Sequence, residues 1–227
     1  MGDGPPATTD KGTPSSRQQA ADVIIEKLRA QDIDASVDVH MRAFTGFFLS
    51  FLGPSFLRQL YLAYCDHPET IALVARKKGS NEILGVAIGC LKPGGFYKRL
   101  MLNRWWRFAL AAAGAACRRP SIIPRLCRAL LYRGDAPSDR LDRALYTSCA
   151  VSPDAQGMGV GKLLTLAILE NAKEAGVPGV FLTTDADNND PVNAFHRRMG
   201  FTVETEFTTP EGRRMFRYIN DFDDQPK

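Results

Sequence analysis

The stretch of sequence that decides the fold reads Gln156-Gly157-Met158-Gly159-Val160-Gly161-Lys162. It follows a β-rich run at residues 144–151 and precedes a strongly helical run that begins near Lys162. Its alternating glycines let backbone N–H groups approach an anion closely, and the dipole of the following helix directs its positive end to the same place. This stretch therefore predicts a turn that binds a diphosphate.

Two common phosphate-binding turns do not match this stretch. A nucleotide-triphosphate loop needs a glycine where Gln156 lies and a Ser or Thr where Leu163 lies. A dinucleotide turn needs a third glycine in place of Lys162, near the first strand of its domain. A third pattern, Gln/Arg-x-x-Gly-x-Gly/Ala, is satisfied by Gln156, Gly159 and Gly161.

The rest of the chain predicts an α/β fold. Apolar runs predict strands at residues 23–28, 70–76, 83–90, 144–151, 180–184, 202–209 and 214–221. Helical spacing predicts helices at residues 33–44, 54–65, 162–175 and 191–199. We expect Asp32 to cap the first helix, Pro54 to lie in the first turn of the second, and Gly176 to end the third. This order predicts a mixed, mostly antiparallel central sheet flanked by helices, with a helical insertion at residues 92–143.

An aromatic band precedes the second strand. We expect most of it to pack in the core and part of it to line a pocket for a second substrate. Its members are Phe44, Phe47, Phe48, Phe51, Phe56, Tyr61 and Tyr64.

Composition points to one globular domain at residues 21–222, after a tail at residues 1–20 that is rich in Gly, Pro, Ser and Thr and expected to be disordered. The five cysteines form no CxxC pair, so we expect reduced thiols. With only three histidines, we expect no metal site. We also expect a cytoplasmic location without a secretory signal. The net charge of +4 is too small to indicate nucleic acid as a partner. We expect a monomer or a homodimer.

The insertion at residues 92–143 is strongly basic. It holds twelve Lys or Arg against three Asp, a net charge of +9, whereas the rest of the chain carries −5. Arginines interrupt its apolar runs, so a membrane span is not expected. Two interpretations stay open: a helical lid with a solvated basic face, or a surface that contacts a polyanionic acceptor or an anionic membrane.

The glycine pattern, with Val151-x-Pro153 before it, resembles the coenzyme A-binding signature of the GNAT-type N-acetyltransferases. A second match lies at residues 189–201, where Asn189-x-x-Val192-x-x-Phe195-His196-x-x-x-Gly200-Phe201 resembles the later motif of that family. His196 stands where the family often has a Tyr that protonates the departing thiolate. The resemblance covers residues 144–201 closely, and the insertion lies outside it.

The resemblance implies an acyl-CoA N-acyltransferase fold, with acetyl-CoA as co-substrate and a small-molecule amine as acceptor. Backbone amides of the glycine turn would bind the pyrophosphate, and the strand before it would bind the pantetheine arm through its main chain. The residues implied at the cofactor are Cys149, Ala150, Val151, Gln156, Gly157, Met158, Gly159, Val160, Gly161, Lys162, Asn189 and Asn193.

Catalysis needs a group that takes a proton from the amine and a group that assists the thiolate. Residues 144–151 contain no carboxylate. Asp185 is therefore our candidate base, with Asp187, His67 and Glu69 as further candidates. His196 is our candidate acid, because an ordinary imidazole pKa of about 6.5 suits proton transfer near neutrality. The aspartates also suit turn and helix-cap roles, and His196 also suits simple packing.

The leading hypothesis is an N-acetyltransferase for a small amine, with an amino sugar or a nucleotide-linked amino sugar preferred because the basic insertion suits a phosphate-bearing substrate. The alternatives are a protein or peptide N-acetyltransferase and a non-catalytic acyl-CoA-binding module on a membrane surface.

Overall fold

The protein was analysed as a computed structural model that describes residues 22–45, 48–96, 99–100, 106–111 and 142–222. The expectations for the tail at residues 1–20 and for most of the insertion at residues 92–143 lie outside the described residues. No helix in the described part of the chain is long and apolar enough to cross a membrane.

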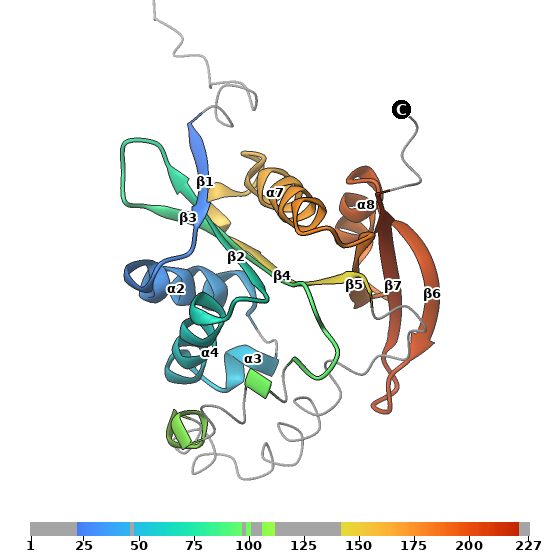
Figure 1. Ribbon diagram of the computed structural model, residues 1–227, viewed down its shortest axis with the longest axis horizontal. Coiled ribbons are helices and arrows are strands. Elements are labelled where there is room, and N and C mark those ends of the chain that lie inside the picture. The colour runs from blue at the N-terminus through green and yellow to red at the C-terminus, as the bar shows by residue number, and fades with distance from the viewer. Residues whose placement is uncertain (1–21, 46–47, 97–98, 101–105, 112–141, 223–227) are drawn as a thin grey trace, which may run out of the picture.

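A seven-stranded sheet forms the centre of the molecule (Figure 1). Its strands, in spatial order, are β1 (Val23–Lys27), β2 (Thr70–Lys77), β3 (Ile83–Cys90), β4 (Ala144–Val151), β5 (Gly179–Asp185), β7 (Arg214–Asp221) and β6 (Thr202–Thr208). All neighbouring pairs are antiparallel except β4 and β5. The predicted fold class is confirmed.

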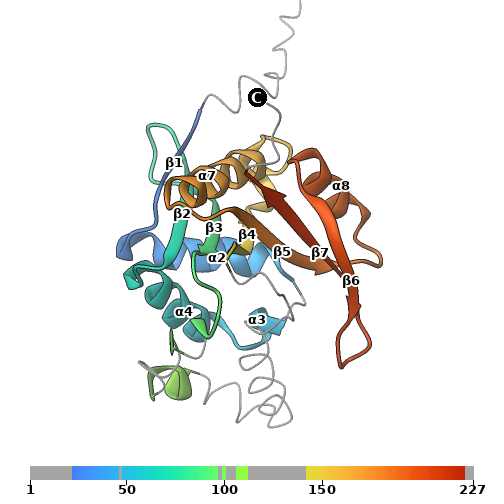
Figure 2. The same ribbon diagram turned by 45° about the vertical axis from the view of Figure 1, so that its right-hand side comes forward.

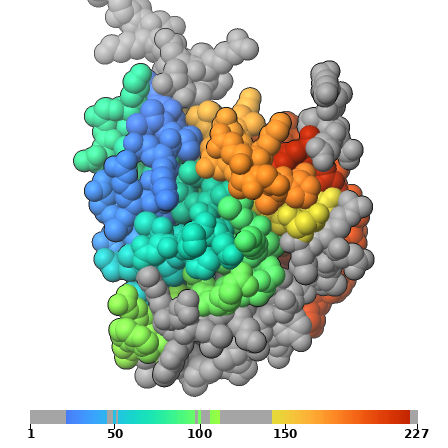
Figure 3. All heavy atoms as spheres, viewed as in Figure 1, coloured from blue at the N-terminus to red at the C-terminus, as the bar shows by residue number. Residues whose placement is uncertain are grey.

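Helices cover both faces of the sheet (Figures 1 and 2). One face carries the short helix α3 (Phe48–Phe51) with α2 (Ile33–Ala43) and α4 (Pro54–Asp66), and we call it the α2–α4 face. The other carries α7 (Val160–Glu174) and α8 (Asp190–Arg198), and we call it the α7–α8 face. In the space-filling view, α7 forms a ridge on the outer surface (Figure 3).

Each face encloses its own apolar core. On the α2–α4 face, Phe56, Tyr61 and Tyr64 are buried, so these members of the aromatic band pack in the core as expected. On the α7–α8 face, Leu164 and Ile168 pack against the sheet. Burying one such side chain contributes about 1.5–3 kcal/mol.

The helix α7 lies unusually close to the sheet at Gly85 in β3. A Cβ atom added there would come within 2.9 Å of Leu164 Cδ1 and of Val160 Cγ1. Glycine at this position therefore sets how near the first turns of α7 approach the sheet, and with them the glycine turn that precedes the helix.

Two helix starts differ from the prediction. Asp32 occupies the N-cap position of α2 but makes no capping bond, because its carboxylate accepts from the Arg29 backbone N–H at 3.1 Å and from Arg76 Nη2 at 2.7 Å. A short 3-10 turn at Ala30–Asp32 places it there. The helix α7 begins at Val160 rather than Lys162, which brings Gly161 and Lys162 into its first turn.

Candidate active site

The parallel strands β4 and β5 separate soon after they meet. Their pairing is limited to Ala144 with Val180 and Leu145 with Phe181. Beyond that point β5 continues to pair with β7 on its other side, while the edge of β4 that faces β5 has no strand partner among the described residues. An unpaired strand edge presents N–H and C=O groups that an extended ligand can bind.

The open part of β4 carries a bulge. Ser148 pairs with Ile88 and Tyr146 pairs with Gly89, which leaves Thr147 as an extra residue. Residues 147–149 are partly exposed in a strand that is otherwise mostly buried, so this stretch is the accessible part of the strand. The Thr147 hydroxyl is buried and has no hydrogen-bond partner among the described residues.

The glycine turn lies where β4 leads into α7. Gly157 and Gly159 have φ values of 83° and 81°, in the left-handed region that only glycine adopts without strain. Because α7 begins at Val160, the amides of Val160, Gly161 and Lys162 have no acceptor within the helix. Together with the helix dipole, these N–H groups form a site suited to a phosphate.

The predicted cofactor residues Asn189 and Asn193 use their side-chain N–H groups inside the protein. Asn189 donates to Thr184 Oγ1 at 2.8 Å and to the Asp185 carbonyl at 3.1 Å. Asn193 donates to the same carbonyl at 3.1 Å and accepts from the Tyr218 hydroxyl at 3.3 Å. Both therefore hold the turn between β5 and α8, which forms the far wall of the opening.

His196 is buried in an aromatic setting. Its ring contacts Phe195, Phe201 and Tyr218, and its Nδ1 atom has no hydrogen-bond partner among the described residues. Burial lowers the pKa of His196 to about 4, because the charged imidazole would lose its hydration. The ordinary pKa assumed from sequence does not hold, and the imidazole is neutral at pH 7.

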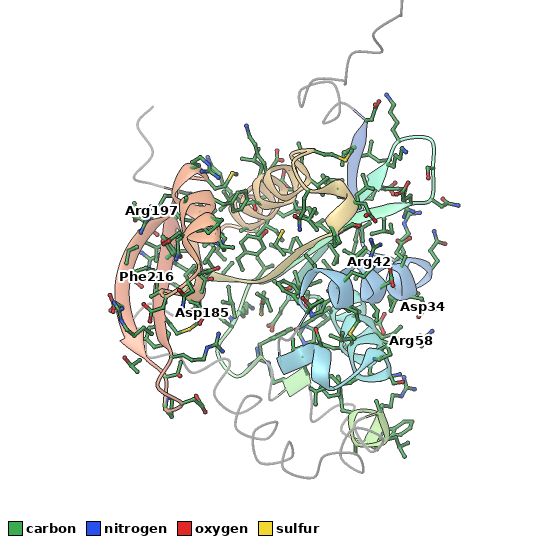
Figure 4. All side chains as sticks on the ribbon, turned by 180° about the vertical axis from the view of Figure 1, so that it is seen from behind. Asp34, Arg42, Arg58, Asp185, Arg197 and Phe216 are labelled. Carbon is green, nitrogen blue, oxygen red and sulfur yellow. The ribbon has the colours of Figure 1, made fainter. Side chains whose placement is uncertain are left out.

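Asp185, the candidate base, is held by an arginine at the end of β5. Arg213 Nη2 donates to both carboxylate oxygens, at 2.7 and 2.6 Å, and Arg213 Nε donates to Oδ1 at 3.0 Å. Asp187 accepts from Arg214 at 2.7 Å. The three bonds from Arg213 fix the orientation of the Asp185 carboxylate at the end of β5. Figure 4 shows it near Phe216 and Arg197, at the opposite end of the molecule from Asp34, Arg42 and Arg58.

The remaining candidate bases, His67 and Glu69, also bond locally. His67 Nδ1 accepts from the Glu69 backbone N–H at 3.2 Å. The Glu69 carboxylate accepts from Arg99 at 2.9 Å and lies 3.8 Å from Lys92 Nζ. These contacts hold both side chains in place at the start of β2.

A line of hydroxyl groups ties β4 to the first turns of α7. Thr165 Oγ1 donates its single proton to the Gly161 carbonyl at 2.8 Å. In its contact with Tyr146 at 3.1 Å, Thr165 Oγ1 must therefore accept, and the Tyr146 hydroxyl donates. Burial raises the pKa of the neighbouring Cys149 thiol to about 11. Cys149 therefore stays protonated at pH 7 and is unsuited to act as a nucleophile.

Two arginines that the sequence analysis did not single out are buried at the other end of β4. Arg143 donates to both oxygens of Asp221, at 2.5 and 2.7 Å. Arg217 lies 4.3 Å over the ring of Phe181 and 2.8 Å from Glu204. Burial lowers the pKa of Arg217, because the guanidinium loses hydration. These ion pairs join β4, β6 and β7 beside the point where β4 and β5 separate.

A buried pair on the α2–α4 face was not predicted from the sequence. His40 Nδ1 lies 3.0 Å from the Tyr61 hydroxyl, and the two side chains come from α2 and α4. The only available signals were that Tyr61 belongs to the aromatic band and that His40 is one of three histidines. Nothing in the linear pattern brings the two together.

A groove of about 440 Å³ between α2 and α4 is separate from these groups. It is lined by Asp34, Val37, Asp38, Met41, Pro54, Ser55 and Arg58. None of these residues belongs to the glycine turn or to the separating strands, so the groove is not part of the candidate site.

The fold and the site together define the acyl-CoA N-acyltransferase class: a mixed sheet whose two parallel strands separate in front of a glycine turn at a helix N-terminus. A family model described as the Acetyltransferase (GNAT) family matches residues 38–201. The chain belongs to the GNAT acetyltransferase family.

Among curated proteins, the chain is similar over a short segment to mycothiol acetyltransferases. It is 50% identical over 52 residues to that of Arthrobacter sp. (strain FB24), which covers 23% of this chain and 16% of the relative. It is 46% identical over 63 residues to that of Saccharomonospora viridis, which covers 27% of this chain and 20% of the relative. The chain thus matches at most a fifth of the length of these two relatives.

Among solved structures, a GCN5-related N-acetyltransferase from Kribbella flavida superposes with a TM-score of 0.58 at 14% identity, covering 89% of this chain and 99% of that one. The ribosomal-protein-S18-alanine N-acetyltransferase from Escherichia coli superposes with a TM-score of 0.53 at 15% identity, covering 90% and 97%. These likenesses show the shared fold.

Proposed function

We propose that this protein transfers the acetyl group of acetyl-CoA to the amine of a small molecule. The observation that carries the proposal is the edge of β4 that has no strand partner within the described part of the chain. This edge leads directly to the amides at the start of α7 that have no acceptor within the helix. Membership of the GNAT family supports acetyl-CoA as the donor.

The open strand has a length suited to the cofactor. From Val151 back to Tyr146, β4 rises about 17 Å, comparable to an extended pantetheine arm. With the pyrophosphate on the amides of Gly159, Val160 and Gly161, the thioester would reach the bulge at Thr147. There the N–H groups of the bulged strand would polarise the carbonyl.

His196 would act on the departing thiolate as a neutral hydrogen-bond donor. Its pKa of about 4 leaves no positive charge at pH 7, so it would not act as an imidazolium acid. A thiolate of ordinary pKa, about 8.5, is a good enough leaving group to need only such a bond.

The acceptor would approach from the α2–α4 face. The helices α7 and α8 cover the other face, and the cofactor would fill the gap between β4 and β5. We favour an amino sugar, free or nucleotide-linked, because the insertion at residues 92–143 carries a charge of +9. The two relatives described above are both mycothiol acetyltransferases, and their name also favours a small molecule over a protein.

The test is release of the coenzyme A thiol from acetyl-CoA in the presence of defined amines. The panel holds D-glucosamine, D-glucosamine 1-phosphate, a uridine-diphosphate-linked amino sugar and a peptide with a free N-terminal alanine. Release with a sugar but not with the peptide is the expected result. Release with the peptide alone makes the protein a peptide N-acetyltransferase, and coenzyme A binding without any release overturns the enzymatic proposal.

A further inference from the structure

A short helix at residues 106–111 carries two exposed apolar side chains. Trp106 is 49% exposed and Leu110 is 69% exposed, the largest fractions among the large apolar residues in the described part of the chain. Residues four positions apart lie on the same side of a helix, so these two side chains form one apolar face. An apolar face of this kind in water favours a binding partner that covers it.

The opposite side of this helix fixes its orientation. Phe108 is 2% exposed, and its ring lies 5.3 Å from the ring of Phe56 on α4. Ala111 packs against the same core. Because successive residues turn by about 100° around a helix, Phe108 and Ala111 point almost directly away from the exposed pair. The packing of the inner side therefore holds Trp106 and Leu110 outward.

The helix lies on the outer side of α4, away from the sheet (Figures 1 and 2). In the space-filling view it reaches the edge of the molecule (Figure 3). The helix α7 covers the opposite face of the sheet. A flat surface bound at residues 106–111 would therefore leave α7, and the glycine turn at its start, uncovered.

Positive charge accompanies the apolar face. Arg107 is exposed, and its guanidinium lies 5.0 Å from the centre of the Trp106 ring, within the range of a cation–π contact. In the sequence, residues 98–119 hold six Lys or Arg and no Asp or Glu. Trp and Leu on one side of a helix, with basic residues beside them, are typical of segments that lie at a membrane–water interface.

The charge also limits which partner can cover this face. A second copy would bring the same insertion, with its charge of +9 over residues 92–143, and like charges would repel. A dissolved polyanion would neutralise the charge but would offer no apolar region to Trp106 and Leu110. An anionic bilayer offers both, because phosphate headgroups lie directly above hydrocarbon.

We propose that the helix at residues 106–111 docks the protein on anionic phospholipid membranes. Trp106 and Leu110 enter the boundary between headgroups and acyl chains, and Arg107 lies among the lipid phosphates. Two contributions add up: burial of apolar side chains, and an attraction to the headgroups that salt screens. The inference goes beyond the proposed acetyl transfer and does not depend on it.

The test measures binding of the full-length protein to lipid vesicles. One set of vesicles is phosphatidylcholine alone, and the other is phosphatidylcholine mixed with phosphatidylglycerol. Both tryptophans of the chain lie at residues 105 and 106, so the intrinsic tryptophan emission reports on this segment. The mixed vesicles should pellet the protein, shift its emission to shorter wavelength, and lose binding as salt rises. No binding to the mixed vesicles, or equal binding to both sets, overturns the proposal.

A double variant tests the apolar face. Trp106→Ser with Leu110→Ser should lower the vesicle partition coefficient at least about 10-fold, because each buried apolar side chain contributes about that factor. Leu166→Ser with Val203→Ser is the matched control, since these side chains are 44% and 41% exposed on α7 and β6. The control should bind as the wild type does. Binding that survives the first pair of substitutions, or falls equally in both pairs, overturns the proposal.

A charge variant tests the basic component. Arg107→Gln should lower the partition coefficient about fivefold, the effect of one basic residue near an anionic surface. Arg214→Gln removes the same charge from an exposed position on β7 and should leave binding unchanged. Equal effects of the two substitutions would assign binding to net charge alone and overturn docking by this helix. Self-association of the wild type that disappears in Trp106→Ser with Leu110→Ser would instead make the face an interface between copies, and would also overturn the proposal.

Discussion

The interactions on the two faces of the sheet join residues that lie at very different separations along the chain. On the α7–α8 face, the groups that would bind the cofactor are neighbours in the chain: Thr165 bonds to Gly161 across four residues. On the α2–α4 face, His40 meets Tyr61 across 21 residues, and beside the point where β4 and β5 separate, Arg143 meets Asp221 across 78. A local site can be recognised from a motif, whereas a long-range site exists only once the chain has folded.

The largest expected effect concerns the long-range ion pairs. Arg143→Ala removes two short hydrogen bonds to Asp221 and should lower the free energy of unfolding by about 3 kcal/mol, because it leaves a poorly solvated carboxylate behind. Chemical denaturation measures the change. Arg58→Ala is the control, since its pair with Asp34 is mostly exposed and should contribute about 0–1 kcal/mol. An equal loss of unfolding free energy in the two variants would show that burial of the Arg143–Asp221 pair adds nothing to stability.

The next effect is a pH dependence from His196. Its folded pKa of about 4 lies below the unfolded value of 6.5, so between these pH values the unfolded chain binds a proton that the folded protein does not. Stability due to this group is present above pH 6.5 and is lost as the pH falls towards 4. The loss approaches about 3 kcal/mol at pH 4.

Urea denaturation at several pH values checks this dependence. His196→Phe should flatten the curve between pH 6.5 and 4 while leaving the rest of the profile in place. An unchanged slope in the variant would show that another group titrates there. The same variant tests the proposed bond to the thiolate, which predicts a lower kcat at pH 7.5 with unchanged coenzyme A affinity.

A smaller effect tests the local site itself. Gly159→Ala places a side chain at a φ of 81° in the turn, which should move the neighbouring amides. Each of these amides would contribute about 1.5–3 kcal/mol through its hydrogen bond to the phosphate. The substitution should therefore weaken coenzyme A binding at least about 10-fold. Gly176→Ala introduces similar backbone strain, at a φ of 76°, beyond the far end of α7. Calorimetric titration with coenzyme A should show the loss only in the first variant. Comparable losses in both would mean that backbone strain, and not the turn, sets the affinity.

The smallest effect concerns Asp185. The Arg213–Asp185 pair is partly exposed, so Asp185→Asn should change stability by less than about 1 kcal/mol. Because Arg213 occupies both oxygens, we also expect kcat with D-glucosamine to stay within about threefold, well short of the loss of a general base. A fall of 100-fold or more would identify Asp185 as the base.

The sequence alone determined much of the framework. Apolar periodicity predicted each strand of the sheet within a few residues, because the side-chain period of a strand or helix is a local property of the backbone. The glycine turn could be recognised for the same reason, since Gly157 and Gly159 specify left-handed backbone geometry wherever the chain goes. The resemblance at residues 144–201 agrees with the family that the whole chain shows.

Tertiary structure decided what the candidate catalytic residues can do. The charge state of His196 depends on the ring of aromatic residues that buries it, and the availability of Asp185 depends on an arginine 28 residues away. Likewise, Asp32 lost its capping role to Arg76, 44 residues away. Residue type sets an intrinsic pKa and a list of donors and acceptors, but solvation and partners come from distant segments. The sequence therefore identified the turn suited to the cofactor, and only the folded chain could bring His40 and Tyr61 together across 21 residues.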